Sequence, residues 1–206
     1  MMEQRTPEWH AARLGRVTAS RVADVVAKIK TGYGSGRANY MAELICERLT
    51  GTQGAFYSNA AIQWGVEKEP DARAAYEEAV GMFVVEVGFI PHNTISMAGA
   101  SPDGLVGDGG LVEIKCPNTA THIDTLLSGF VPNKYINQMQ WQMACTGRQW
   151  CDFVSFDPRM PEGMQIWIKR VDRDNVLIAE LEKEVISFLS ELEKKIVQLK
   201  EKTGGI

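Results

Sequence analysis

The stretch that decides the fold is residues 101–115, which read SPDGLVGDGGLVEIK. Two short apolar runs flank the sequence DGG at 108–110, and such residues are typical of a tight turn between antiparallel strands. We therefore expect a β-hairpin whose first strand ends near Val106 and whose second strand begins near Leu111.

The second strand of this hairpin carries charge on one face. Successive side chains of a strand point to opposite faces, so Glu113 and Lys115 share one face while Val112 and Ile114 line the other. The apolar pair predicts a side that packs in the core, and the charged pair predicts a chemical role for the other side. In either plausible register, Asp103 of the first strand lies opposite Glu113 or its immediate neighbour.

These acidic residues have the chemistry of a metal site. Two carboxylates at a strand end repel each other, and a bound divalent cation removes that cost. Oxygen ligands without Cys or His favour Mg²⁺ or Mn²⁺ over zinc. Lys115 can then orient or deprotonate a water beside the metal, a set of groups that suits phosphodiester hydrolysis. An isolated Glu-x-Lys would more simply be the exposed face of an edge hairpin. The Pro102-Asp103 pair at hairpin distance favours the metal site.

Length and charge restrict the class of protein. The 206 residues contain no repeat and no Pro/Ser-rich linker, so we expect a single domain over residues 1–206. The net charge of −4 argues against a polycation that coats nucleic acid, and DNA contact would need a local basic patch. Basic residues outnumber acidic ones in the first fifty residues: Arg5, Arg13, Arg16, Arg21, Lys28, Lys30, Arg37 and Arg48.

Neither membrane segments nor cysteine motifs are evident. No apolar run reaches the roughly 18 residues of a membrane span, and the N-terminus lacks the apolar core of a signal peptide, so a cytoplasmic location is expected. The four cysteines form no CxxC pair and have no histidines at zinc spacing. We expect them to be reduced thiols that fill space in the core.

Periodicity predicts an α/β sandwich around one mixed sheet. We also expect two local features. The third helix should bend or restart at Glu69-Pro70, because proline disfavours helical geometry in the residue before it. The final helix should cover the sheet. The expected helices cover residues 18–29, 37–51, 59–80, 119–128, 133–145 and 172–200, and the expected strands 82–90, 94–101, 104–107, 111–117, 149–157 and 164–172.

The sequence resembles the bacteriophage lambda exonuclease family, within the PD-(D/E)xK nucleases. The resemblance covers most of the chain through six motifs: WHAARLGRVTAS at 9–20, WGVEKEPDAR at 64–73, SPDGL at 101–105, EIKCP at 113–117, YINQMQ at 135–140 and FDPRM at 156–160. It implies a restriction-endonuclease-like α/β core with a central mixed β-sheet flanked by helices. It also implies a Mg²⁺-dependent exonuclease, in which Mn²⁺ can substitute, that digests one strand of duplex DNA from the 5′ end and leaves a 3′ overhang.

The resemblance assigns roles to individual residues. It makes Asp103 and Glu113 metal ligands, helped by the main-chain carbonyl of Ile114, and it gives Lys115 the attacking water. Other matching residues are Glu69, a further active-site carboxylate near a second metal; Gln138, which supports the catalytic centre; and Arg13, Ser20 and Ser101, which hold the 5′-phosphate. Glu67 lies two residues from Glu69, but the flanking WG and DAR favour Glu69.

Local sequence gives a separate reason to expect an anion site near Arg13. Thr18 and Ser20 precede an apolar helical pattern, and the free amides at a helix N-terminus attract phosphate. Arg13 can add a two-pronged contact to phosphate oxygens. Without the family resemblance, the simpler interpretation is a surface arginine and an ordinary helix cap.

The family also implies assembly and partners. It implies a homotrimeric ring around double-stranded DNA ends, a single-strand annealing protein as functional partner, and an origin in a phage or prophage of a bacterial cell. Two alternatives remain open. One is a restriction or junction-cleaving endonuclease on the same core, and the other is a catalytically inactive module that binds DNA ends.

Overall fold

The computed structural model describes residues 3–30, 32–54 and 59–204 of the chain. Its main feature is a five-stranded mixed sheet in the order β10-β9-β8-β7-β4. Strands β8 and β9 are parallel, and the other neighbouring pairs are antiparallel. The strands are β4 (Val84–Val85), β7 (Gly104–Val106), β8 (Gly110–Lys115), β9 (Trp150–Phe156) and β10 (Ile166–Asp172).

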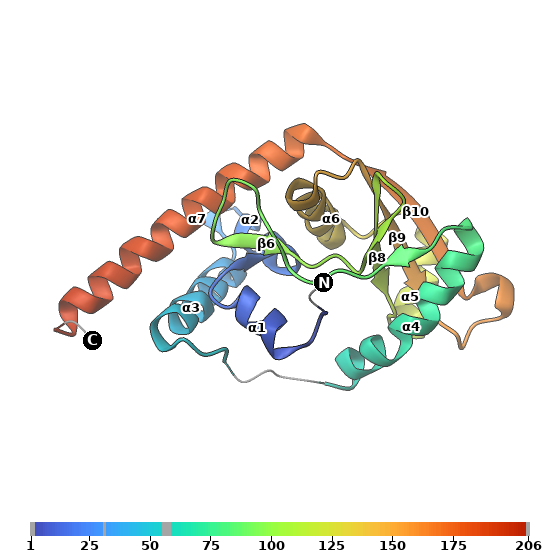
Figure 1. The fold of residues 1–206 in the computed structure, drawn as a ribbon, viewed down its shortest axis with the longest axis horizontal. Coiled ribbons are helices and arrows are strands. Elements are labelled where there is room, and N and C mark those ends of the chain that lie inside the picture. Colours follow the sequence, from blue (N-terminus) through green and yellow to red (C-terminus); the bar gives the residue numbers. More distant parts are fainter. Residues whose placement is uncertain (1–2, 31, 55–58, 205–206) are drawn as a thin grey trace.

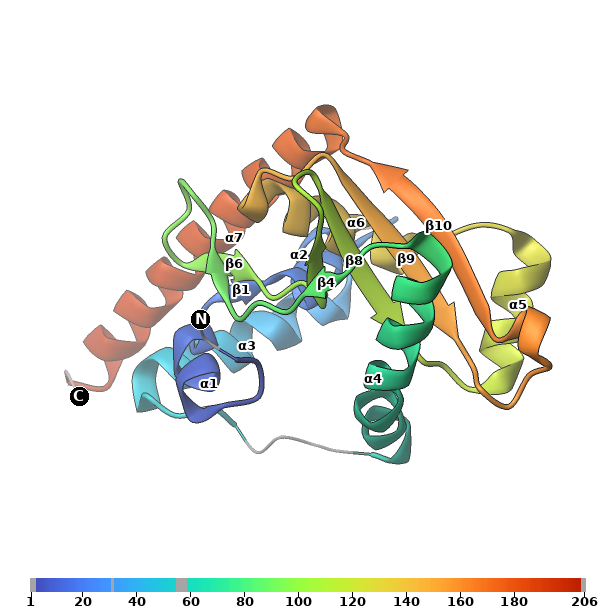
Figure 2. The same cartoon turned by 45° about the vertical axis from the view of Figure 1, so that its right-hand side comes forward.

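Helices cover both faces of this sheet (Figures 1 and 2). On one face, Ala72 and Tyr76 of α4 (Ala60–Val80) pack against Val112 and Ile114 of β8. On the other face, α6 (Asn133–Thr146) packs against Leu111 and the inward side chains of β9. Helix α5 (Thr119–Ser128) lies beside β9 on this second face, where His122 bonds to Ser155. The strand that carries Glu113 is therefore enclosed by helices on both sides.

The N-terminal and C-terminal parts of the chain pack beside the main sheet. A three-stranded sheet of β1 (Val17–Thr18), β6 (Ala98–Ala100) and β5 (Ile90–Pro91) joins α1 (Pro7–Arg13) to the main sheet. Helix α7 (Asn175–Lys202) packs against α2 (Val22–Val26), α3 (Ser35–Thr50) and α6. The remaining elements are short: η1 (Ala19–Arg21), η2 (Glu162–Met164) and the hairpin of β2 (Lys28–Ile29) with β3 (Gly32–Tyr33).

Most of the expected elements are confirmed. The hairpin forms with Gly104 opposite Val112 and Val106 opposite Gly110, as the turn residues indicated. Helix α3 ends at Gly51, whose φ of 68° is the left-handed conformation that glycine adopts without strain. The Asn59 side chain accepts a hydrogen bond from the Ile62 amide and so caps the N-terminus of α4. The expected α/β fold, with a mixed sheet flanked by helices, is confirmed.

Four expectations were wrong in detail. Helix α4 continues through Pro70, so of the bend or restart expected there the restart does not occur. The missing amide of proline leaves the carbonyl of Val66 without its helical partner, and both residues are exposed, so water can bond there. The final helix packs mainly against other helices and meets the main sheet only near Ile178, which joins the apolar cluster of Leu111 and Phe153. The strand expected over 82–90 divides into β4 and β5. The small strands form sheets of their own, so the chain has more than one sheet.

The helix expected over 18–29 is also shorter than its apolar pattern suggests. Only Val22–Val26 is α-helical, and it follows the single 3₁₀ turn η1. Neither Thr18 nor Ser20 makes a side-chain capping bond; Thr18 precedes η1 and Ser20 lies inside it. The helix whose N-terminus was expected to bind a phosphate is therefore reduced to one 3₁₀ turn and five α-helical residues.

The four cysteines are free thiols, as expected. Cys145 and Cys151 are buried, but Cys116 is only partly buried and Cys46 is exposed, so the expectation that all four fill the core was wrong for Cys46. Among the described residues, no helix combines the length and the apolar character that crossing a bilayer requires.

Candidate active site

The hairpin brings Asp103 to the strand that carries Glu113. The pairing of Gly104 with Val112, continued by one residue, places Asp103 opposite Glu113. Oδ2 of Asp103 accepts a hydrogen bond of 2.7 Å from the amide of Ile114. This bond fixes one carboxylate oxygen against the main chain of β8, so the two acids are held together by backbone geometry.

Glu113 is completely buried, yet both of its oxygens have partners. Gln138 Nε2 donates to Oε1 and Gln142 Nε2 donates to Oε2, each at 2.6 Å. The ammonium group of Lys115 forms an ion pair with Oε1. The charged face of β8 is therefore not an exposed surface, because α6 lies over it and supplies the donors that a buried carboxylate needs.

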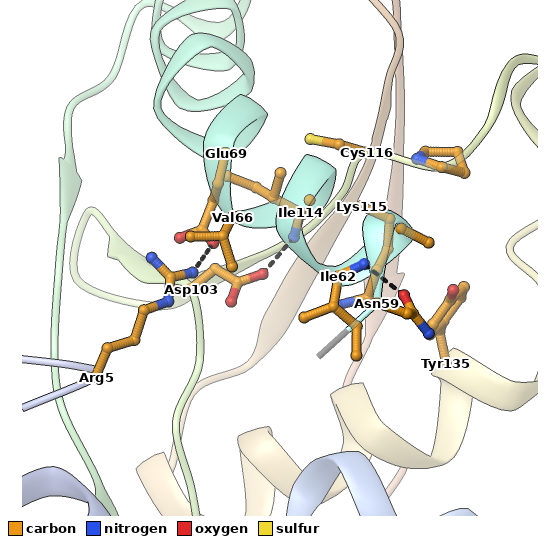
Figure 3. A pocket seen from close by; sticks show the side chains of 13 residues that line it. Arg5, Asn59, Ile62, Val66, Glu69, Asp103, Ile114, Lys115, Cys116 and Tyr135 are labelled. Atoms are coloured by element: carbon orange, nitrogen blue, oxygen red, sulfur yellow. Dashed lines mark hydrogen bonds and ion pairs between the residues drawn. The ribbon is translucent and has the colours of Figure 1, made fainter. Parts of the chain in front are cut away.

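Glu69 reaches the same place from the other side of the sheet. It lines a pocket of about 510 Å³ together with Asp103, Ile114 and Lys115 (Figure 3). Its Oε1 accepts a hydrogen bond of 3.0 Å from Arg73 Nη2, and its Oε2 forms an ion pair with Arg5. Glu67 is 69% exposed, so Glu69 is the glutamate of this helix that the structure brings to the pocket.

Burial controls the electrostatics of these groups. Burial first, and then the neighbouring charge of Glu113, raises the pKa of Asp103 to about 8. Burial alone would lower the pKa of Lys115, but Glu113 and Asp103 outweigh it and raise that pKa above its usual value. Burial also raises the pKa of the Cys116 thiol to about 12. The pocket therefore holds a carboxyl group that resists ionisation until a cation arrives.

The residues fit a Mg²⁺ ion that keeps several of its waters. In the described part of the chain, no three His, Cys, Asp or Glu side chains converge tightly enough to form a complete metal cage. Mg²⁺ is commonly bound through only one or two carboxylates, and Asp103 and Glu113 are two adjacent carboxylates whose mutual repulsion a cation would relieve. Glu69 is already paired with two arginines, so direct metal binding there would require one of them to move.

Of the three residues assigned to a 5′-phosphate, Arg13 lies beside each of the other two. Arg13 Nη1 donates to Ser101 Oγ at 3.2 Å, and Trp9 Nε1 donates to the same hydroxyl at 2.9 Å. Arg13 and Ser20 line a pocket of about 220 Å³ with two further arginines, Arg16 and Arg21. Burial lowers the pKa of Arg13 from its ordinary value near 12.5, which leaves it cationic at neutral pH.

Sequence reasoning missed three polar residues of this site. Gln142 could have been found, because it lies four residues after Gln138 and so on the same side of a helix. Arg73 lies four residues after Glu69, the spacing of a helical ion pair. No local signal pointed to Arg5, since its contact with Glu69 joins segments 64 residues apart.

The mixed α/β fold thus places the fully buried Glu113, the partly buried Asp103 and Lys115 beside one another at the end of the hairpin, an arrangement that suits phosphodiester hydrolysis. Residues 8–149 match the YqaJ-like viral recombinase domain, and the chain belongs to that family. It resembles the alkaline exonuclease LHK-Exo from Laribacter hongkongensis, with 61% identity over 97% of this chain and 98% of that one. The TM-score is 0.91 for the crystal structure of LHK-Exo in complex with dAMP and 0.90 for the other crystal structure.

A more distant structure shares the fold alone. The phage-related exonuclease from Haemophilus somnus 129PT is 17% identical, with a TM-score of 0.71 over 89% of this chain and 96% of that one. A search of curated proteins gives no match. The resemblance to recombination exonucleases is thus confirmed, and the chain is a member of a family of viral-recombinase-like alkaline exonucleases.

Proposed function

We propose that the protein is a Mg²⁺-dependent exonuclease that digests the 5′-ended strand of linear duplex DNA and leaves a 3′ single-stranded overhang. The observation that carries this proposal is the convergence of Asp103, Glu113 and Lys115 beside the pocket that Glu69 lines. Mn²⁺ is expected to substitute for Mg²⁺, since both prefer oxygen ligands.

Each residue of the site has a separate role in this proposal. Asp103 and Glu113, with the carbonyl of Ile114, would hold the first ion, and Glu69 would bind a second ion directly or through water. The ions supply Lewis-acid stabilisation of the phosphoryl charge and a more acidic water. Gln138 and Gln142 keep the Glu113 carboxylate in one orientation, and Lys115 holds the attacking water next to it.

One observation supports the direction of digestion, and a second supports the release of single nucleotides. Arg13 contacts Ser101, which is two residues from Asp103, so at most about 7 Å of extended chain separates this phosphate contact from that acid. A 5′-phosphate bound there would place a nearby phosphodiester over the carboxylates. LHK-Exo binds dAMP, and a site that accepts a nucleoside monophosphate suits an enzyme that releases single nucleotides.

The decisive experiment uses linear duplexes labelled at either the 5′ or the 3′ end, with Mg²⁺ or with EDTA. Early release of the 5′ label, and its absence in EDTA, is the expected result. Early release of the 3′ label would contradict the polarity. Cleavage of covalently closed DNA would favour a restriction or junction endonuclease, and binding without digestion would favour an inactive end-binding module.

Assembly and partners form part of the same proposal. A net charge of −4 gives the surface little general attraction for DNA, so a homotrimeric ring around the duplex would keep the enzyme on its substrate. Light scattering that gives the mass of a stable monomer would contradict the ring. A single-strand annealing protein would use the exposed 3′ overhang, within the cytoplasm of a bacterial cell that carries the phage or prophage.

A further inference from the structure

Arg5 has a backbone conformation that stability alone does not explain. Its φ of 68° makes it the one non-glycine residue with positive φ among the described residues. This conformation costs an L-residue with a Cβ roughly 1–2 kcal/mol, and glycine avoids the cost. An observed outlier of this kind justifies asking what function the strained residue serves.

The neighbours of Arg5 hold it firmly in place. Gln4 Nε2 donates to the carbonyl of Val87 at 2.9 Å and to that of Pro102 at 2.8 Å. On the other side, Thr6 Oγ1 accepts from the amide of Trp9 at 3.3 Å and begins helix α1. Arg5 is thus fixed between the residue that precedes Asp103 and the helix that carries Arg13, and its left-handed turn directs the side chain into the active-site pocket (Figure 3).

The ion pair of Arg5 with Glu69 does not compensate for this strain. The Arg5 side chain is 49% exposed, and exposed ion pairs contribute about 0–1 kcal/mol. Glu69 also has a second cation in Arg73, which is only 15% exposed and lies 3.0 Å away. Arg5 is therefore the more weakly held of the two arginines and can exchange its partner at little cost.

We propose that Arg5 is a substrate-contacting residue of the active site, which leaves Glu69 when DNA enters and binds a backbone phosphate of the strand held over Asp103. This inference rests on the proposed nuclease function. The guanidinium group can bind two phosphate oxygens at once and stays charged at every working pH. Its departure frees Glu69 Oε2, the oxygen that a second metal ion or its water would need.

The test compares wild-type protein with Arg5→Gly and Arg5→Lys. Glycine adopts a φ of 68° without strain, so Arg5→Gly removes the guanidinium but keeps the turn. It should fold with an unchanged or slightly higher Tm. Lys195→Ala is the control for loss of one positive charge, because Lys195 is exposed on the far half of α7. Binding of a 5′-phosphorylated duplex is measured by fluorescence anisotropy with Ca²⁺ in place of Mg²⁺, at several salt concentrations.

We expect Arg5→Gly to weaken binding about tenfold, which is about 1.4 kcal/mol. The slope of log affinity against log salt should fall by about one, because one phosphate contact is lost. Arg5→Lys should keep the slope and lose part of the affinity. Lys195→Ala should match wild type in both.

Two results would overturn the inference. If Arg5→Gly binds DNA with the affinity and slope of wild type but needs more Mg²⁺ for half-maximal digestion, Arg5 only positions Glu69. If neither property changes, Arg5 has no role in the site. Failure of the proposed function has a different signature, since wild-type protein itself would then leave linear duplex undigested in Mg²⁺.

Discussion

Gln138 and Gln142 lie one turn apart on α6, and each donates one hydrogen bond of 2.6 Å to a different oxygen of the buried Glu113 carboxylate. A carboxylate with both oxygens occupied has one orientation, which is what a metal ligand requires before the metal arrives. Oε1 of Gln142 accepts a weak bond from the thiol of Cys151, 3.9 Å away, which is consistent with the orientation of its amide.

We predict that Gln142→Leu lowers digestion by about ten- to hundredfold, because a hydrogen bond to a charged group contributes about 1.5–3 kcal/mol. The variant should also need more Mg²⁺ for half-maximal activity, since Oε2 of Glu113 then loses its donor and only Oε1 remains held. A Mg²⁺ titration of the rate measures both effects.

The matched control is Gln140→Ala. Gln140 is also a buried glutamine of α6, but it bonds to the carbonyl of Asp172 and the amide of Asp174, away from Glu113. This change should lower the Tm and leave the Mg²⁺ dependence as it was. An equal shift in Mg²⁺ dependence for both variants would show that Gln142 acts only through general stability.

The acids and the lysine of the hairpin give a second prediction. Asp103→Asn, Glu113→Gln and Lys115→Ala should each abolish Mg²⁺-dependent digestion while the protein stays folded by circular dichroism. Each change removes a charge that the metal or the attacking water would contact. Residual rates within about tenfold of wild type, or about 1.4 kcal/mol in the barrier, would be too small a loss for such roles.

A feature of the structure could be predicted from the sequence when the residues that determine it are close together in the chain. The DGG turn and the two-residue period fixed the hairpin, and they brought Asp103 to Glu113 correctly. The four-residue spacing places Gln142 on the same side of the helix as Gln138, but it does not show that this helix covers Glu113, because that packing is a tertiary feature. The continuous helix at Pro70 was missed for a related reason: packing of its neighbours, such as Ala72, outweighs the local penalty of proline.

A third prediction concerns pH and the FDPRM motif. The Asp157 side chain is fully buried and accepts from Arg159 Nε at 2.7 Å and Nη2 at 3.0 Å. Burial alone would raise the pKa of Asp157, but hydrogen bonds from Arg159 and Thr119 outweigh it and lower the value to about 2. The unfolded value is about 3.9, so the ion pair stabilises the fold above pH 4, and this contribution is lost as the pH falls from about 4 to about 2.

Asp157→Asn should therefore lower the free energy of unfolding by about 1–2 kcal/mol at pH 7, with a smaller difference from wild type at pH 3. The lower part of this range allows for solvent screening of Arg159, which is nearly half exposed. Urea unfolding at several pH values measures the difference. Asp108→Asn, at an exposed turn position, is the control and should have no such trend. A difference that stays constant from pH 7 to pH 3 would mean that shape and not charge explains the loss.

The last prediction is that the enzyme prefers a 5′-phosphorylated end and that Arg13→Ala removes this preference. The helix expected near Ser20 is only a 3₁₀ turn followed by five α-helical residues, so we expect side chains to provide most of the attraction for phosphate. Arg13 is the central one, because it lies 4.1 Å above the Trp9 ring and donates to Ser101, which hold its guanidinium in one position. Loss of its charge-assisted hydrogen bonds, at about 1.5–3 kcal/mol, predicts a fall of about ten- to hundredfold on phosphorylated ends.

The measurement compares digestion of matched duplexes with a 5′-phosphate or a 5′-hydroxyl. Arg13→Lys keeps the charge but not the two-pronged geometry, so it should retain only part of the preference. Binding of Mn²⁺, followed by calorimetry, should be the same in wild type and Arg13→Ala, because Arg13 contacts neither Asp103 nor Glu113 through any bond that the structure records. Equal rates on both ends in the wild type would contradict a role for the pocket. A terminal phosphate that the pocket does not recognise cannot draw the next phosphodiester toward the carboxylates.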